Sequence, residues 1–344
     1  MAAALEETTV SYEDLAAIER EFDDVETEIN QTPKMGKEGK KKTNAPFLSV
    51  RKQTELTTPL YASRQKTLSA IPNFWPLVLE QAPPDIDQYI QPSDSALLLS
   101  SLTSFSVSRF EAPAEPRSIT LRFEFSDNEY FEDAVLEKRF WYRRAADGWQ
   151  GLVSEPVGIR WREGRDLCGG LLGLVGKAYA SSPAATPASK KEKTTTTTKV
   201  TAEQKELAKT IENTGMGGLS FFAFFGFIGR RISAEENAAA VEEARKGGAR
   251  KLEEGDGDEG DDMEDLELDM SLEIFPDGEE LALAFADDLW PGAIKYFTQA
   301  QEQDALSDAD FEDSDAEIED LDDQEVGADD DDDDARPTKK QRSS

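Results

Sequence analysis

The chain has 344 residues, 38 basic and 72 acidic, and a formal net charge of −34 at pH 7. It contains no histidine and one cysteine, Cys168, which excludes Ser–His–Asp and Cys–His catalysis, histidine-based metal sites and an intrachain disulfide framework. Two blocks, at 252–273 and 301–335, hold 12 and 19 acids and no base, and the rest is nearly neutral. Such blocks are typical of disordered interaction segments, and they favour a cationic protein over nucleic acid as partner.

The N-terminus, MAAALEETTV, lacks the basic and apolar regions of a signal peptide. The most apolar run, at 219–228, is half the roughly 20 residues that span a bilayer. We therefore expect a soluble intracellular protein that does not bind membranes.

The first predicted element is a helix at 10–30, after a disordered N-terminus at 1–9. Its apolar residues follow the alternating spacing of three and four that is typical of a helix pairing with another helix. This predicted dimerisation stripe consists of Leu15, Ile18, Phe22, Val25 and Ile29. A surface helix that packs on its own domain would give the same pattern.

A basic segment rich in proline and glycine follows at about 31–49, and prolines and glycines there forbid a regular helix. Helical composition resumes at Val50, and IPNFWP at 71–76 ends it, with a Phe–Trp pair that suggests a buried turn. Prolines then divide 77–104 into short helices, one of which Asp94 is placed to cap.

Alternating apolar residues over 105–165 predict an antiparallel meander of roughly four strands, with one apolar and one polar face. The strands are predicted in FSVSRFE, SITLRFEFS, VLEKRFWYRR and VGIRWRE, and Asp147-Gly148 is a hairpin turn signal.

Helices are predicted next at 167–180, 200–213 and 233–251, with a low-complexity linker at 181–199. The aromatic run from Phe221 to Phe227 is either an exposed binding patch or core, and we favour core because so many exposed apolar residues would aggregate. An amphipathic helix interrupted by Pro291 is predicted at 274–299, with Leu281, Leu283, Phe285 and Leu289 turned inward.

In this order, the heptad helix, IPNFWP, ITLRFEF, DNEYFEDAVLEKRFWY, SFFAFF, DLWPGAIKYF and the acidic tail resemble the nucleosome assembly protein family, most closely its SET branch with its fungal members. The resemblance implies an α+β fold: a long N-terminal dimerisation helix over 10–70, then an "earmuff" domain over 71–300 in which an antiparallel β-sheet packs against helices. Flexible insertions are expected at about 181–199 and 252–272, and a disordered acidic tail at 301–344.

The family helix would run without interruption, so the insertion at 31–49 either loops out, truncates the helix or is untranslated sequence retained in the chain. The implied function is that of a homodimeric, nuclear histone chaperone, shuttling through the cytoplasm, which binds core histones and promotes nucleosome assembly. The alternative is a regulatory or adaptor subunit of a histone-modifying enzyme, such as an acetyltransferase, or a phosphatase inhibitor. No catalytic residue, metal, cofactor or sequence-specific nucleic-acid binding is implied.

Four groups of residues are candidate sites. The folded acids expected to bind histones, which are otherwise a solvated helix face, are Asp277, Glu279, Glu280, Asp287 and Asp288. The first acidic block, Glu253 to Asp269, is either a histone-binding loop or a solubilising insertion. A nuclear-localisation signal is expected at Arg336, Lys339, Lys340 and Arg342. The alternative is that this basic cluster has no function. Ser307 and Ser314 each precede an acid by three residues and suit an acidophilic kinase.

Overall fold

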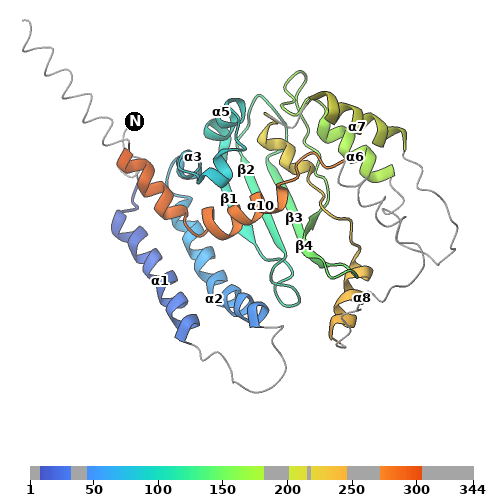
Figure 1. The fold of residues 1–344 in the computed structure, drawn as a ribbon. Helices are drawn as coiled ribbons and strands as arrows, with labels where there is room; N and C mark the ends of the chain where they lie inside the picture. The colour runs from blue at the N-terminus through green and yellow to red at the C-terminus, as the bar shows by residue number, and fades with distance from the viewer. Residues whose placement is uncertain (1–7, 32–44, 182–200, 215–217, 246–271, 304–344) are drawn as a thin grey trace, which may run out of the picture. The chain divides into compact units, whose positions relative to one another are not determined.

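The computed structural model of the 344-residue chain describes residues 8–31, 45–181, 201–214, 218–245 and 272–303. The elements that we name are those within these ranges, and they confirm the predicted α+β class. Figure 1 shows a four-stranded sheet with helices on its flanks.

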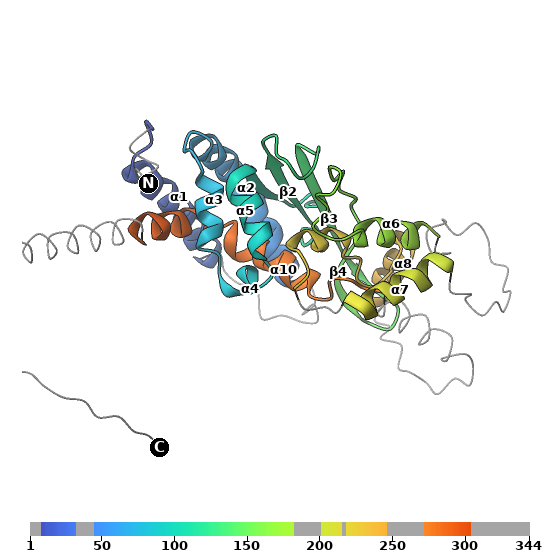
Figure 2. The ribbon, with the colours of Figure 1, turned by 90° about the horizontal axis from the view of Figure 1, so that it is seen from above.

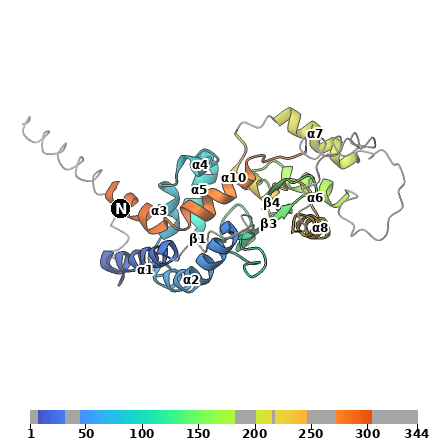
Figure 3. The same cartoon turned by 60° about the horizontal axis from the view of Figure 1, so that its bottom comes forward.

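The N-terminal part consists of two helices, α1 (Tyr12–Gln31) and α2 (Ala45–Leu68), which pack against each other. Contacts between Phe22 and Tyr61 and between Glu28 and Lys52 show that they run antiparallel. Figure 3 shows them side by side. In place of the single run that the family resemblance implies, helix α1 ends and the chain turns back.

Short helices lead from α2 to the sheet: α3 (Phe74–Glu80), α4 (Pro84–Asp87) and α5 (Pro92–Ser101). The predicted buried turn at IPNFWP is the start of α3, where Phe74 and Trp75 are each 2% exposed. Asp94 caps α5 as predicted, since its carboxylate accepts from the Gln91 backbone N–H at 3.0 Å.

The sheet is an antiparallel meander in the order β1-β2-β3-β4, as predicted. Its strands are β1 (Leu102–Ser108), β2 (Ile119–Phe125), β3 (Val135–Arg144) and β4 (Gln150–Ser154). The predicted turn at Asp147-Gly148 joins β3 to β4, and Gly148 has a φ of 95°, which glycine adopts without strain.

The fourth strand differs from the prediction. VGIRWRE forms only an isolated bridge, between Phe131 and Trp161, and the strand lies earlier, at Gln150–Ser154. The reason lies in the backbone hydrogen bonds. The N–H of Ser154 donates to Ile228 and that of Val157 to Phe225, so this part of the chain is tied to the aromatic run.

Helices after the sheet cover its apolar face and one end. They are α6 (Leu171–Ser181), α7 (Ala202–Thr214), the 3₁₀ helix η2 (Phe221–Gly226), α8 (Ala234–Arg245), α10 (Gly278–Ala284) and the π-helical turn η3 (Phe285–Leu289). Helices α6 and α7 lie side by side in Figure 2. The aromatic run is core, as we favoured, because every phenylalanine from Phe221 to Phe227 is at most 3% exposed.

Candidate functional site

Residues 274–290 place the predicted acids on one short stretch of helix whose apolar side faces the core. Leu281, Phe285 and Leu289 are at most 1% exposed, as predicted for inward residues. Leu283 was predicted to turn inward as well, but it is 39% exposed. Leu283 lies in α10, two residues from both Leu281 and Phe285. Two residues turn roughly 200° around an α-helix of about 3.6 residues per turn, so Leu283 lies on the face opposite the buried stripe. Helix α10 begins at Gly278, where a Cβ would collide with the Phe227 ring.

Glu279 is the one predicted acid with a structural role. Its Oε1 accepts a 2.8 Å hydrogen bond from the backbone N–H of Leu152, which ties α10 to the edge strand β4. Burial raises the pKa of this carboxyl, although the bond to Leu152 opposes the shift. Glu279 is only half-exposed, so we remove it from the surface that a partner would meet.

Asp287 and Asp288 are exposed but already have partners within the chain. The Arg109 guanidinium donates to Asp287 Oδ1 at 3.1 Å, and the Tyr296 hydroxyl donates to Asp288 Oδ1 at 2.8 Å. Burial and the Asp288 carboxylate raise the pKa of Tyr296 to about 12. A basic partner would have to compete with Arg109 for Asp287.

Asp277 and Glu280 lie at the start of the same segment, next to Tyr89. The Tyr89 hydroxyl donates to Asp277 Oδ2 at 2.9 Å, and its ring packs on Phe275 with centroids 5.2 Å apart. Burial raises the pKa of Tyr89 to about 12, and the hydrogen bond to Asp277 and the charges of Asp277, Glu280 and Asp85 add to the shift.

We call Asp85, Tyr89, Asp277 and Glu280 the Tyr89 patch. Its three acids are exposed, and Asp85 comes from α4, which contacts α10; Figure 2 shows the two helices together. Asp85 was not among the predicted residues, because nearly 200 residues separate it from Asp277. Among the residues that the structure describes, none of these three acids has an ion pair with a base.

A buried lysine holds the aromatic run of residues 221–227 against the sheet. Lys138, on the apolar face of β3, is fully buried, and its ammonium donates to the carbonyls of Glu155, Phe225 and Phe227 at 2.8–3.0 Å. Burial lowers the pKa of Lys138 to about 7, against the opposing charges of Glu273 and Glu155. The sequence signal was a lysine among the inward residues of a strand, and we missed it.

Glu273 completes this anchor immediately before α10. Its Oε2 accepts from the backbone N–H groups of Ile228 and Gly229, at 2.9 Å each. Burial raises the pKa of this carboxyl, while the two hydrogen bonds and the charge of Lys138 lower it. Together Lys138 and Glu273 fix where α10 begins, and hence where its acids lie.

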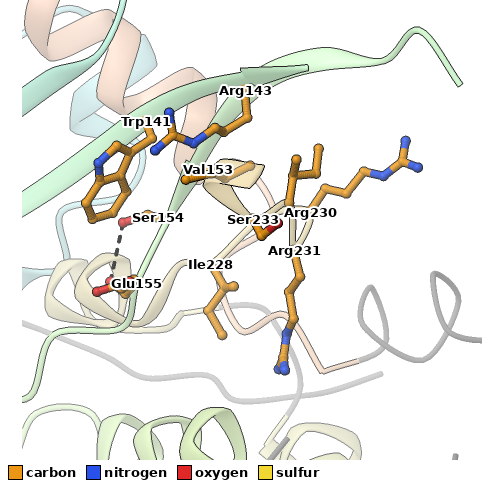
Figure 4. Close-up of a pocket in the computed structure, with 11 residues that line it drawn as sticks. Trp141, Arg143, Val153, Ser154, Glu155, Ile228, Arg230, Arg231 and Ser233 are labelled. Carbon is orange, nitrogen blue, oxygen red and sulfur yellow. Dashed lines mark hydrogen bonds between the residues drawn. The ribbon is translucent and has the colours of Figure 1, made fainter. Parts of the chain in front are cut away.

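A cavity of about 320 Å³ lies on the other face of the sheet, between β3, β4 and the start of α8. Three arginines line it, but each interacts with another part of the chain. Arg143 lies 3.7 Å from Glu111, Arg230 pairs with Asp147 at 2.6 Å, and Arg231 packs over the Tyr179 ring. In Figure 4 the side chains of Arg230 and Arg231 diverge from each other, so the three guanidinium groups do not converge on one anion.

The remaining predicted sites fall outside the described residues. They are the first acidic block up to residue 271, the basic cluster from Arg336 to Arg342, and the two serines, Ser307 and Ser314. Within the described ranges, no group of three or more cysteine and acidic residues is placed to hold a metal ion. No helix in those ranges is both long and apolar enough to cross a bilayer.

Comparison with known proteins gives a consistent result. The family model of the nucleosome assembly protein matches residues 6–300. The chain is 36% identical over 172 residues to the putative nucleosome assembly protein C36B7.08c of Schizosaccharomyces pombe, covering 47% of this chain and 61% of that protein. It is 30% identical over 131 residues to Protein SET of Drosophila melanogaster, covering 37% and 46%. The matches therefore span about half to three fifths of the length of these relatives.

Two solved structures are similar over most of both chains. A crystal structure of Ccp1 is 27% identical, covers 84% of this chain and 94% of its own, and has a TM-score of 0.41. The Vps75 histone chaperone is 19% identical, covers 85% and 98%, and has a TM-score of 0.43.

Proposed function

The chain belongs to the nucleosome assembly protein family, and from this premise we propose that it is a histone chaperone. It binds core histones through acidic surfaces and transfers them to DNA during nucleosome assembly. The observation that carries the proposal is the match to the family over residues 6–300, and the Tyr89 patch supplies an exposed acidic surface on the folded part. The proposed activity is binding and transfer, without catalysis.

The mechanism follows from charge. Carboxylates of the Tyr89 patch and of the two acidic blocks cover the Lys- and Arg-rich surface with which histones bind DNA. Many exposed charge pairs, each weak, give a complex that forms fast, weakens with salt and dissociates readily. DNA, with its higher charge density, then displaces the chaperone.

Charge reversal with a matched control tests the folded surface. In the full chain, Asp85→Lys with Glu280→Lys changes the patch by four charges. Glu163→Lys with Glu206→Lys makes the same change at two exposed acids on other elements. Exposed charge contacts are worth about 0.2–1 kcal/mol each, so we expect the patch variant to bind core histones roughly tenfold more weakly than the control at equal ionic strength. Equal affinities in fluorescence titrations would reject the patch.

Finer parts of the proposal rest on the family and on short sequence patterns. We propose a homodimer, a nuclear location directed by Arg336, Lys339, Lys340 and Arg342, and phosphorylation at Ser307 and Ser314. An additional role as an adaptor for a histone acetyltransferase, or as a phosphatase inhibitor, would use the same fold with an enzyme as partner. Binding to purified core histones alone separates the chaperone from an adaptor that requires the enzyme.

A further inference from the structure

Arg64, near the end of α2, is a buried cation that has no carboxylate partner among the described residues. It is 1% exposed, and its guanidinium packs over the Tyr61 ring at 4.7 Å and the Trp290 ring at 4.4 Å. Its Nη2 donates to Trp290 O at 2.8 Å and its Nη1 to Pro291 O at 3.2 Å. Burial lowers the pKa of Arg64 to about 10, so the group stays charged at neutral pH. A buried cation is costly unless it is well bonded, and here the polar partners are two backbone carbonyls.

The two carbonyls lie at a break in the helical segment that carries the acids. The N–H of Trp290 donates to Phe285 O in the π-helical turn η3, and Pro291 has no N–H to donate. Helix resumes over 293–303. Carbonyls at the end of a helix lack intrahelical donors and carry partial negative charge. A cation that binds both of them therefore fixes the angle between the two helical pieces.

Asp288 takes its position from both sides of this break. Its backbone belongs to η3, and its Oδ1 accepts at 2.8 Å from the hydroxyl of Tyr296, which belongs to the piece after the break. Gly292 between them is tightly packed, because a Cβ there would lie 3.1 Å from both Asp288 O and the Tyr296 ring. A change in the angle between the two pieces would therefore separate the hydroxyl from the carboxylate.

We infer that Arg64 is a positioning residue for the Asp288 carboxylate. By holding the break, it keeps this carboxylate on the Tyr296 hydroxyl and in a fixed direction at the surface, where Asp288 is exposed. The Trp290 ring stacks on Trp75 with centroids 5.5 Å apart, which anchors the side chain and leaves the backbone carbonyl to Arg64. The inference deepens the proposed function, and it rests on that function for the role of Asp288 toward histones.

Carbon-13 NMR of the tyrosine Cζ atoms tests this geometry in the full chain. Burial and Asp288 raise the pKa of Tyr296 to about 12, so this side chain stays largely protonated at about pH 11. Tyr296→Phe assigns its signal among the seven tyrosines. In Arg64→Met we expect the pKa to fall toward the value of about 10 of a free tyrosine, because the hydrogen bond to Asp288 is lost. Arg64→Lys keeps a charged donor and should give an intermediate value.

Leu68→Ala is the matched control, because Leu68 lies on the same helix and is 1% exposed. The cavity that it leaves should lower the thermal transition without changing the Tyr296 titration. Circular dichroism at each pH identifies the range over which every chain is folded. An unchanged Tyr296 titration in Arg64→Met and Arg64→Lys would overturn the inference, since Arg64 would then stabilise the fold without positioning Asp288.

Core-histone titration of a double-mutant cycle links the geometry to binding. Asp288→Asn should weaken binding roughly two- to fivefold, the range of one exposed charge contact, and Arg64→Met should do the same. The double variant should bind no more weakly than either single variant, because both remove one contact; losses that multiply would overturn the inference. If Asp288→Asn alone leaves the affinity unchanged, the role of Asp288 toward histones is rejected, and the Tyr296 titration still decides whether Arg64 positions the carboxylate.

Discussion

Removing the buried ammonium of Lys138 should destabilise the fold by a predictable amount. Lys138→Met keeps the length and apolar stem of the side chain but removes the donor. Phe225 O keeps the bond from Val157 N, and Glu155 O keeps a long 3.3 Å bond from Ser154. Phe227 O is left without its 2.8 Å donor. At about 1–3 kcal/mol for a buried group left unpaired, the one unpaired carbonyl predicts a loss of roughly 1–3 kcal/mol.

The loss of unfolding free energy in Lys138→Met should increase with pH. In the native protein Lys138 has a pKa of about 7, below the 10.5 of a free lysine, so between these values the unfolded state binds more protons. The Lys138 contribution to the free energy of unfolding therefore rises with pH across this window, by up to about 1.4 kcal/mol per unit, and is constant below it. The methionine variant lacks this dependence, so its deficit should grow from pH 7 to pH 10.

The assay is urea unfolding followed by tryptophan fluorescence, at several pH values, on the full chain. For a domain of this size the loss corresponds to a fall in Tm of roughly 2–12 °C. Lys295→Met, at an exposed lysine, is the control and should change stability by less than about 0.5 kcal/mol. If Lys138→Met matches the parent at pH 7 and the two pH profiles are parallel, the three hydrogen bonds do not anchor the aromatic run.

Three further predictions concern the acids. Arg109→Ala should free Asp287 and tighten core-histone binding two- to fivefold, since an exposed pair is worth about 0.2–1 kcal/mol; weaker binding in titration would show that Asp287 needs its arginine. Glu279→Ala should lower the free energy of unfolding by about 1–3 kcal/mol through the unpaired N–H of Leu152, and a normal urea midpoint would contradict the structural role. The predicted tail began at residue 301, but residues 301–303 are helical and Gln301 is buried, so the deletion starts at residue 304. Deleting 304–335 should leave the thermal transition unchanged, slow histone association and flatten its salt dependence. Identical stopped-flow rates would show that the tail contributes only to solubility.

Local patterns predicted most of the sheet. The alternation in SITLRFEFS and the Asp147-Gly148 turn depend on near neighbours, and both were confirmed. The prediction of the fourth strand was wrong because the pairing there depends on residues that are distant in the sequence. Pro156 has no N–H to give to a ladder, and Val157 donates to Phe225 instead. Apolar and polar residues do alternate in VGIRWRE, but the segment forms only the isolated bridge at Trp161 and pairs with no strand of the sheet.

The apolar spacing in α1 could not predict that α1 pairs with α2 of the same chain, for a different reason. Spacing of three and four shows that a stripe needs a helical partner, but an intrachain and an interchain partner satisfy it equally. We kept both interpretations open, and the structure places α2 of the same chain on the stripe. Pairing with a second copy stays a prediction.

The five acids predicted on the last helix looked equivalent in the sequence, and what separates them is the partner that each finds elsewhere in the fold. Glu279 accepts a hydrogen bond from the backbone N–H of Leu152 in β4. Its removal should therefore lower the stability of the fold more than the affinity for histones. Asp287, itself exposed, pairs with the half-buried Arg109, and a histone cation can replace this pair at small cost. Glu280 has neither a backbone hydrogen bond like that of Glu279 nor an arginine partner like that of Asp287. It lies near Asp277 and Asp85, and the repulsion among these three carboxylates is relieved when a cation binds. An acidic surface therefore gains affinity chiefly from carboxylates that the fold leaves close together and unpaired by bases, and the number of acids in a segment is a poor guide to them.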